Sequence, residues 1–282
     1  MEVIQLDRGD RDRVHQFLDR KLPVHQHLGW QHALNWLGRQ PFLAAVEGDQ
    51  LLGVVACPAD NQHSTWLRLF AARDSRIMDR IWDLLWVEAA RILKAGSGVG
   101  EVYTLIVEDW LQALVERSGF QQVDHVVVLS WDGGPLPELT LKAEAVIRPL
   151  REGDLDEVHE IDQVSFDSAW RNSREQLERA LQVSALATVI EVNGKTAGYQ
   201  ISTASTLGGH LARLAVAPDQ RGMGLGKALV LDVLDRFQDQ GAVRITVNTQ
   251  RSNLISLQLY QEIGFGLEDE IYPVYRSAIR ED

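Results

Sequence analysis

The chain carries one sequence pattern twice, and this repeat limits the fold more than any other feature. The segment Trp66–Arg76 matches the segment Leu211–Arg221 when the sequence is shifted by 145 residues. The same shift carries Gly53 onto Gly198, and a shift that persists across separate segments is typical of a duplicated unit. We therefore expect two copies of one fold.

A stretch rich in glycine and proline separates the copies. Residues 131–137 include two glycines and two prolines, which is typical of a linker. At 282 residues, the chain is long enough for two separate cores. We predict an N-terminal domain, a linker and a C-terminal domain at residues 1–130, 131–142 and 143–282.

The second copy holds a glycine-rich turn between a predicted strand and a predicted helix. Apolar residues dominate 211–216, and others recur at helical spacing over 229–237. A glycine-rich turn that enters a helix leaves backbone N–H groups unpaired at the positive end of the helix dipole. Such a turn binds phosphate oxygens. The candidate phosphate-binding residues are Arg221, Gly222, Met223, Gly224, Leu225, Gly226 and Lys227.

The spacing of this turn separates it from two common phosphate-binding patterns. A P-loop ends in Lys-Ser or Lys-Thr, but here Ala228 follows the lysine. A dinucleotide fingerprint reads G-x-G-x-x-G, whereas this turn reads G-x-G-x-G. With Arg221, Gly224 and Gly226 at its fixed positions, the turn resembles the Arg/Gln-x-x-Gly-x-Gly/Ala loop of the GNAT acyltransferases, which bind acetyl-CoA.

Residues further along the chain extend this resemblance. Asn253, Tyr260 and the pair Gly264-Phe265 stand where GNAT proteins carry an N-x6-Y-x3-G-F element. The second copy is most similar to the ribosomal-protein alanine N-acetyltransferase branch, and the tandem layout resembles that of mycothiol synthases. The resemblance implies an α+β (α/β sandwich) chain of two tandem GNAT acyl-CoA N-acyltransferase folds, with mixed, mostly antiparallel sheets.

The first copy lacks the cofactor residues. Under the repeat shift, the three glycines of the loop correspond to Ile77, Asp79 and Ile81. An aspartate and two branched side chains would meet pyrophosphate with a like charge and a steric clash. Tyr260 corresponds to Val115. We therefore expect a degenerate N-terminal copy that serves as a structural partner or as a wall of the substrate cleft.

The resemblance assigns roles to several residues of the second copy. It implies that Tyr260 donates a proton to the departing CoA sulfur, although an aromatic core residue is the ordinary alternative. It implies that the backbone of Leu214, Ala215 and Val216 holds the acetyl carbonyl and the pantetheine arm. Asn253 would bond the cofactor arm, cap the following helix, or do both.

The general base is less well marked. The resembling branch usually places a glutamate five residues before the asparagine, but Asn248 stands there and an amide does not accept a proton at neutral pH. Glu191, at the end of a predicted strand, is our candidate. His210 and a water chain to backbone carbonyls are alternatives. The ordinary interpretation of Glu191 and His210 is that each is an exposed residue at a strand end.

Two further groups of polar residues have ordinary alternatives. Asp167 lies where the family has its substrate loop, so it could pair with a cationic amine or cap the helix that begins near Ser173. His25, His27 and His32 lie close together in sequence. Metal binding would need another ligand, so we predict a solvated face and no metal site.

The amino-acid composition limits the cellular compartment and the classes of partner that we expect. The net charge is −12, about −6 in each half, which disfavours nucleic acid as a partner. Cys57 is the only cysteine, so a reducing compartment fits and no internal disulfide forms. The charged N-terminus and the lack of a long apolar run argue against a signal peptide and a membrane span. We expect a cytoplasmic protein, and a monomer because two fused copies can replace a homodimer.

These observations predict an acetyl-CoA-dependent N-acetyltransferase. Acetyl-CoA would be the cosubstrate, and the acceptor would be an amine-bearing small molecule or a protein N-terminus that attacks directly in a ternary complex. The alternative is a non-catalytic acyl-CoA-binding or regulatory module. The presence of Asn248 in place of a glutamate supports this alternative, and the presence of Tyr260 argues against it. The sequence does not identify the acceptor.

Overall fold

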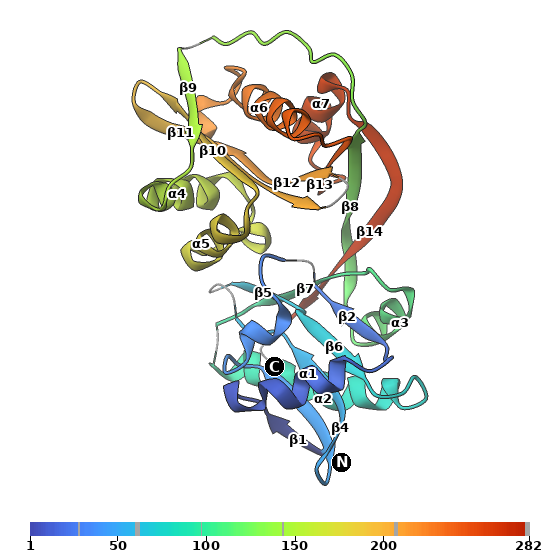
Figure 1. Ribbon diagram of the computed structural model, residues 1–282. Coiled ribbons are helices and arrows are strands. Elements are labelled where there is room, and N and C mark those ends of the chain that lie inside the picture. The colour runs from blue at the N-terminus through green and yellow to red at the C-terminus, as the bar shows by residue number, and fades with distance from the viewer. Residues whose placement is uncertain (28, 60–62, 97, 143, 206–207, 280–282) are drawn as a thin grey trace. The chain divides into compact units, whose positions relative to one another are not determined.

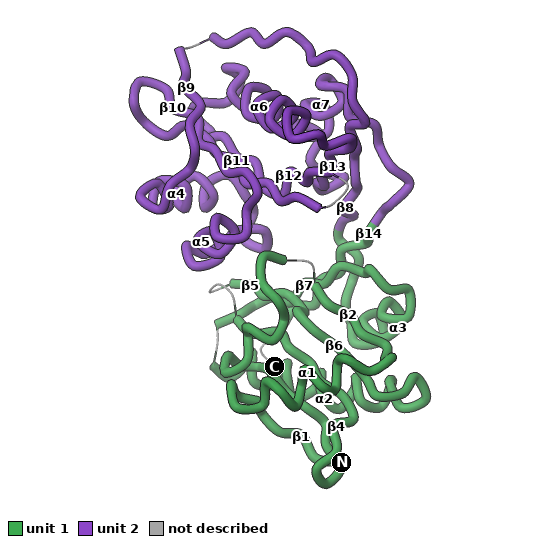
Figure 2. Tube along the Cα trace, viewed as in Figure 1, with its two compact units in different colours: residues 1–123, 272–282 green, residues 124–271 purple. Residues whose placement is uncertain are grey.

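The computed structural model describes residues 1–27, 29–59, 63–96, 98–142, 144–205 and 208–279. The chain forms two compact units, which Figure 2 colours separately. Unit 1 comprises residues 1–123 and 272–282, and unit 2 comprises residues 124–271. None of the described helices is long and apolar enough to cross a membrane.

Unit 2 is built on a mixed sheet. From β8 onward its strands follow the order β8, β13, β12, β11, β10, β9. Only β12 and β13 pair in parallel, and the other neighbours are antiparallel. The bounds are β8 Gln121–Trp131, β9 Ala145–Pro149, β10 Leu186–Val192, β11 Lys195–Ser205, β12 Gly208–Val216 and β13 Arg244–Gln250.

Four helices cover this sheet. Helices α6 and α7 lie on one face, and α4 and α5 lie on the other (Figure 1). The apolar side of α6 is buried because Leu229, Val233 and Phe237 recur at helical spacing. The bounds are α4 Leu155–Ser165, α5 Arg174–Val183, α6 Leu225–Asp239 and α7 Leu254–Ile263.

Unit 1 contains two groups of paired strands. One has the order β1, β3, β4, β6, β2, and the other has the order β5, β7, β14. The strand bounds are β1 Glu2–Gln5, β2 Val24–Gln26, β3 Phe42–Glu47, β4 Gln50–Ala56, β5 Ser64–Trp66, β6 Leu69–Ala72, β7 Glu101–Leu105 and β14 Gly266–Ala278. Its helices are α1 Arg11–Leu18, α2 Met78–Gly96 and α3 Asp109–Arg117. Short 3-10 turns of the chain lie at Arg8–Asp10, Ala33–Trp36, Glu152–Asp154, Ser168–Trp170 and Pro218–Gln220.

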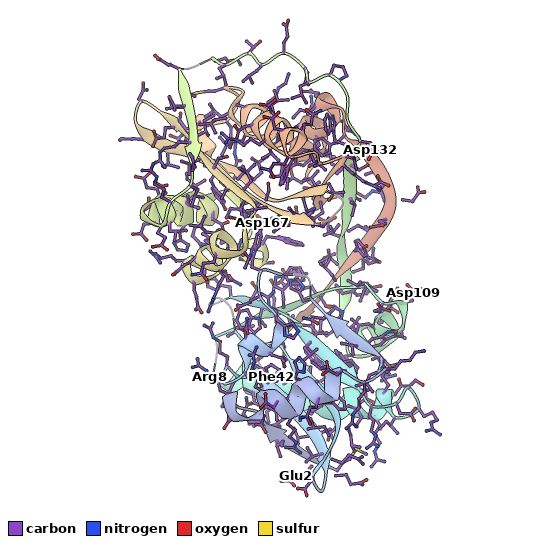
Figure 3. The ribbon with its side chains drawn as sticks, in the orientation of Figure 1. Glu2, Arg8, Phe42, Asp109, Asp132 and Asp167 are labelled. Atoms are coloured by element: carbon purple, nitrogen blue, oxygen red, sulfur yellow. The ribbon has the colours of Figure 1, made fainter. Side chains whose placement is uncertain are left out.

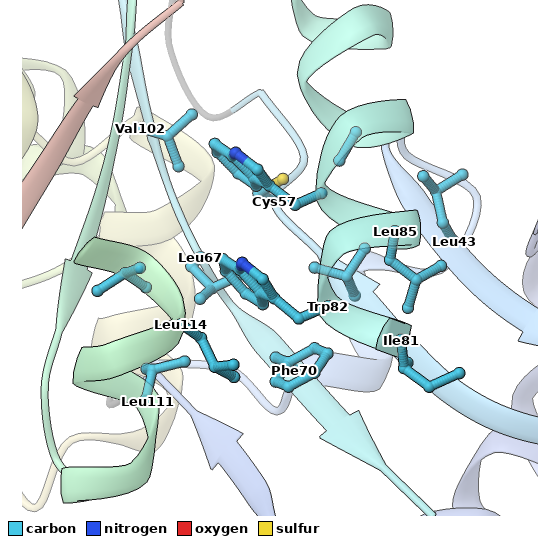
Figure 4. Close-up of a cluster of buried hydrophobic side chains, with 14 of the residues drawn as sticks. Leu43, Cys57, Leu67, Phe70, Ile81, Trp82, Leu85, Val102, Leu111 and Leu114 are labelled. Atoms are coloured by element: carbon cyan, nitrogen blue, oxygen red, sulfur yellow. The ribbon is translucent and has the colours of Figure 1, made fainter. Parts of the chain in front are cut away.

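The core of unit 1 is rich in aromatic rings. Trp82 on α2 meets the edge of Phe70 at 5.0 Å between ring centroids, and its indole N–H donates a 2.7 Å hydrogen bond to Ser118 Oγ. Burying one such ring stabilises the fold by roughly 4 kcal/mol. Cys57 is fully buried in the same cluster (Figure 4).

The boundaries of the units differ from the predicted domain ranges because β8 and β14 each span both units. Val126–Trp131 of β8 pair with β13 in unit 2, although they precede the predicted linker. Val274–Ala278 of β14 pair with β7 in unit 1, although they end the predicted second domain. Each unit therefore contains a strand from the other half of the sequence.

Candidate functional site

The glycine-rich loop forms the predicted turn between β12 and α6. Gly222 and Gly224 have φ values of +76° and +87°, a backbone region that residues with a Cβ rarely adopt. Within the described residues, no acceptor bonds the backbone N–H groups of Gly222 to Lys227. These donors at the N-terminus of a helix fit phosphate oxygens.

The linker lies against this loop. The Lys142 N–H donates to the Met223 carbonyl oxygen at 3.1 Å, and Lys227 Nζ donates to the Glu138 carbonyl oxygen at 2.8 Å. A Cβ on Gly224 would lie 2.6 Å from the Thr140 carbonyl oxygen. Position 224 therefore requires glycine for two reasons, its positive φ and its close approach to the linker.

Strands β12 and β13 part beside the loop. Their parallel pairing joins Gly208–Leu211 to Arg244–Val247 and then stops. Beyond Leu211, β12 continues to Val216 while paired with β11 alone. A one-residue register shift at this point marks a bulge at Ala212. The bulge and the end of parallel pairing together leave one edge of β12 open.

The open edge carries unpaired backbone groups. The Ala217 N–H donates to the Ala197 carbonyl oxygen at 2.9 Å. Because hydrogen-bonded and non-hydrogen-bonded pairs alternate along antiparallel strands, the Leu214 and Val216 backbone groups point away from β11. The Val216 carbonyl accepts from Arg221 Nε at 3.2 Å. The Leu214 N–H and carbonyl are available to an extended ligand.

Tyr260 lies on α7 in the buried cluster that also contains Leu211 and Val247, the last parallel pair. Its side chain is 4% exposed, and its hydroxyl makes no hydrogen bond to any described residue. Burial raises the pKa of Tyr260 well above its usual value. The phenol therefore keeps its proton at neutral pH.

With this geometry described, comparison with known proteins gives the family. The acetyltransferase (GNAT) family model matches residues 155–265. Unit 2 contains a GNAT acetyltransferase domain. A putative [ribosomal protein bS18]-alanine N-acetyltransferase of Bacillus subtilis is 29% identical over 124 residues, 44% of this chain and 82% of that protein. The [ribosomal protein bS18]-alanine N-acetyltransferase of Escherichia coli K12 is 28% identical over 122 residues, 42% and 79% of the two chains.

Solved structures extend the similarity of fold to the whole chain. A tandem GNAT protein from the clavulanic acid biosynthesis pathway superposes with a TM-score of 0.68 at 13% identity, over 100% of this chain and 99% of that one. A GCN5-related N-acetyltransferase from Kribbella flavida gives 0.68 at 12% identity, over 98% and 70%. The predicted tandem GNAT fold class is therefore confirmed.

Glu191 lies apart from the opening of the GNAT domain. It is on β10, which β11 separates from β12. Its carboxylate pairs with the Arg148 guanidinium at 2.6 Å, and Arg148 also binds Asp154 at 2.7 Å. The structure does not bring Glu191 and Tyr260 together, and the role of base gains no support from this geometry. The arginine was visible in the sequence, but its pairing across two strands was not.

His210 lies at the closed end of the opening. Its Nδ1 is 2.9 Å from Thr246 Oγ1, its parallel partner on β13. Burial lowers the pKa of His210, and a hydrogen bond that the ring donates to the Asn248 side chain opposes this effect. Asn248 itself is exposed. The imidazole is thus held in place and stays neutral near pH 7.

Asn253 begins α7. Its side-chain oxygen accepts a hydrogen bond from the Ser256 N–H at 3.2 Å. The predicted capping role is therefore confirmed, and its role toward the cofactor remains a prediction.

A buried ionic network fixes the loop between α4 and α5, and the sequence analysis missed it. Asp162 is fully buried and accepts from Arg213 Nε at 2.9 Å and from the Tyr199 hydroxyl at 2.5 Å. Arg213 also donates to the Trp170 carbonyl oxygen at 2.7 Å. Its guanidinium lies 3.5 Å from the centre of the Phe166 ring. An aspartate among the apolar positions of a helix was the only sequence signal.

Helix α5 is capped by Ser173 and not by Asp167. Ser173 accepts from the Gln176 N–H and begins the helix, so Asp167 does not cap it. Asp167 is exposed in the loop between α4 and α5 (Figure 3), and pairing with an amine remains a prediction.

His25 and His27 do not lie on a solvated face, so that prediction was wrong for these two, whereas His32 is exposed. His25 is 1% exposed, and burial lowers its pKa to about 4. His27 is half-buried and lies against Trp66 in a tilted arrangement, 4.7 Å between ring centroids. His32 caps the turn at Ala33–Trp36. No group of metal-binding side chains occurs in the described part of the chain.

Strand β2 fills the edge of unit 1 that corresponds to the open edge of the GNAT domain. It pairs with Leu69–Ala71 of β6, and the repeat shift carries these residues onto Leu214–Val216. His25 on β2 also reaches Thr104 Oγ1 on β7 at 3.4 Å. The chain itself thus occupies the position that stays open in unit 2.

Proposed function

We propose that this chain is an acetyl-CoA-dependent N-acetyltransferase, in which a primary amine attacks the acetyl thioester directly in a ternary complex. One observation carries the proposal. Unpaired backbone groups occur both at the start of α6 and at Leu214 on the open edge of β12, the strand whose Leu211 packs in the cluster of Tyr260.

Each part of the cosubstrate has a counterpart among these groups. The pyrophosphate would accept from the N–H groups of Gly222–Lys227, where the helix dipole also favours negative charge. The amides of the pantetheine arm would pair with Leu214 and Val216 as an added strand does. Arg221 holds the Val216 carbonyl and so shapes the turn between the two regions.

The chemistry needs one proton donor and one proton acceptor. The amine nitrogen forms a bond to the carbonyl carbon, and the C–S bond then breaks. The thiolate takes a proton from the Tyr260 hydroxyl, while the amine gives one proton to a base. The Leu214 N–H, on the open edge, is our candidate to bond the oxyanion.

The acceptor is a primary amine of a small molecule or of a protein N-terminus. The bacterial relatives named above act on an alanine of ribosomal protein bS18, which supports a protein N-terminus. A non-catalytic acyl-CoA-binding module is the second candidate, because Asn248 replaces the carboxylate of the resembling branch.

Two measurements test the proposal. Calorimetric titration with acetyl-CoA should give one site per chain, because β2 fills the corresponding edge of unit 1. A panel of amines and N-terminal peptides should then release CoA thiol, detected with a chromogenic disulfide. Binding without release by any amine would favour the non-catalytic module, and two sites per chain would contradict the assignment of unit 1.

A further inference from the structure

We propose that His210 is the general base that takes the proton from the attacking amine. This inference rests on the proposed acetyl transfer and names the missing proton acceptor of that site. It starts from two facts. Asn248 cannot act as a base, and Glu191 is held by Arg148 outside the opening.

The position of His210 along β12 places it at the end of the opening toward which the reacting group is directed. His210 and Thr246 form the parallel pair immediately before Leu211 and Val247, where pairing ends. A ligand whose phosphates sit at the start of α6 and whose arm follows Val216 and Leu214 has its far end directed toward this closed end. The thioester is at that far end.

The two faces of the sheet divide the acid from the base. Successive residues of a strand point to opposite faces, so His210 and Thr246 share one face while Leu211 and Val247 share the other. Leu211 and Val247 belong to the buried cluster of Tyr260. The phenol therefore approaches the thioester from the face of α6 and α7, and the imidazole approaches from the face of α4 and α5.

The face that carries His210 also carries an exposed polar side chain. Asn248, two residues beyond Thr246 on the same face, is exposed to solvent. Arg213 also lies on this face, and its charge is balanced by Asp162 and tied to the loop between α4 and α5. The polar side chains of this face suit the approach of an amine toward His210.

The hydrogen bond to Thr246 sets the protonation of the ring. In the tautomer in which Nδ1 donates to Thr246 Oγ1 across 2.9 Å, the lone pair is on Nε2. Nε2 then takes the amine proton through a water molecule, because the Leu214 N–H that would bond the oxyanion lies four residues further along β12. Burial lowers the pKa of His210, so the ring begins each turnover neutral. After transfer the imidazolium returns its proton through solvent, and Tyr260 recovers the one that it gave to sulfur.

Substitution of His210 separates proton transfer from folding. His210→Gln keeps an amide that can hold Thr246 but cannot accept a proton, and His210→Ala leaves space for imidazole. Both variants should bind acetyl-CoA with a Kd within about threefold of the parent. With an amine found in the panel, kcat should fall by about 100-fold, the scale of general base catalysis, and added imidazole should restore part of the rate of His210→Ala.

A matched control and an alternative complete the test. The side chain of His159, on α4, makes no hydrogen bond or ion pair to any described residue, and His159→Gln should leave kcat unchanged. If His210→Gln keeps the parent kcat, or if Glu191→Gln alone removes turnover, the assignment of His210 is wrong while acetyl transfer stands. If the parent chain releases no thiol with any amine, both proposals fail.

Discussion

Lys227 donates a hydrogen bond from Nζ to the backbone carbonyl oxygen of Glu138, 2.8 Å away. One residue belongs to the phosphate loop, and the other belongs to the linker between the two copies. The linker therefore has a fixed course across the loop, reinforced by the bond from Lys142 to Met223. Phosphate and the Glu138 carbonyl would compete for the same ammonium.

We expect Lys227→Met to loosen the linker. A hydrogen bond of this kind contributes about 1 kcal/mol, so cleavage after Glu138 by a glutamate-specific protease should accelerate about fivefold. Acetyl-CoA affinity should also fall, because a cation beside the pyrophosphate is lost. Lys142→Met is the control, since its backbone bond to Met223 remains. An unchanged cleavage rate in Lys227→Met would show that the bond does not restrain the linker.

The loop can be tested without disturbing the fold at Gly226. A Cβ there would make only ordinary contacts, the nearest 3.5 Å from Leu259, and aspartate in the first turn of a helix is favourable. Gly226→Asp should therefore fold normally but bind acetyl-CoA at least about 100-fold more weakly, because its carboxylate repels the pyrophosphate. Gly226→Ala should bind within about threefold of the parent. Calorimetry measures both, and equal binding by the two variants would refute the phosphate site.

Tyr260→Phe should separate chemistry from stability. The hydroxyl makes no hydrogen bond to a described residue, so we expect the midpoint of thermal unfolding to stay within about 2 °C of the parent value. The Kd for acetyl-CoA should remain unchanged. The kcat should fall by about 100-fold, because the thiolate loses its proton donor. Unchanged turnover would return Tyr260 to the role of a core residue.

Unit 1 should lose stability in mild acid. Burial lowers the pKa of His25 from 6.5 to about 4, so below pH 6.5 the unfolded chain binds a proton that the folded chain does not. The stabilisation is present above pH 6.5 and is lost as the pH falls toward 4. Between pH 7.5 and pH 5 the loss from this residue is about 2 kcal/mol.

Urea denaturation of unit 1, followed at several pH values, measures this loss. The buried tryptophans of unit 1 provide the fluorescence signal, and His25→Leu should flatten the dependence. His15→Gln, on the exposed side of α1, should leave it unchanged. A pH dependence that persists in full in His25→Leu would assign the effect to other groups.

Local features of the fold were predictable because they depend on a few neighbouring residues. The Asn193-Gly194 pair is a strong local signal for a two-residue hairpin turn. The structure has that turn between β10 and β11, with φ values of 52° and 74° at the two residues. The long helix of the second copy ends near Gly241, whose φ is +84°. The loop glycines at 222 and 224 likewise have the left-handed backbone that their pattern indicated.

Long-range pairing was not predictable from the same sequence. The repeat shift carries β8 onto β14, so the two strands are equivalent in the two copies. Either strand could therefore pair with β7 or with β13, and the sequence pattern does not distinguish the two arrangements. The partnership of Glu191 with Arg148 joins two strands and leaves no local signal. The burial of His25 also depends on a strand pairing, that of β2 with β6.

Strand β2 has a consequence for the behaviour of the two halves in the absence of ligand. An unpaired strand edge attracts other extended chains and promotes aggregation. Unit 1 covers its edge permanently with residues of its own, whereas the GNAT domain would cover the edge of β12 only while a ligand lies along it. The stability of unit 1 should then be the same at any acetyl-CoA concentration. The stability of the GNAT domain should increase as that concentration rises.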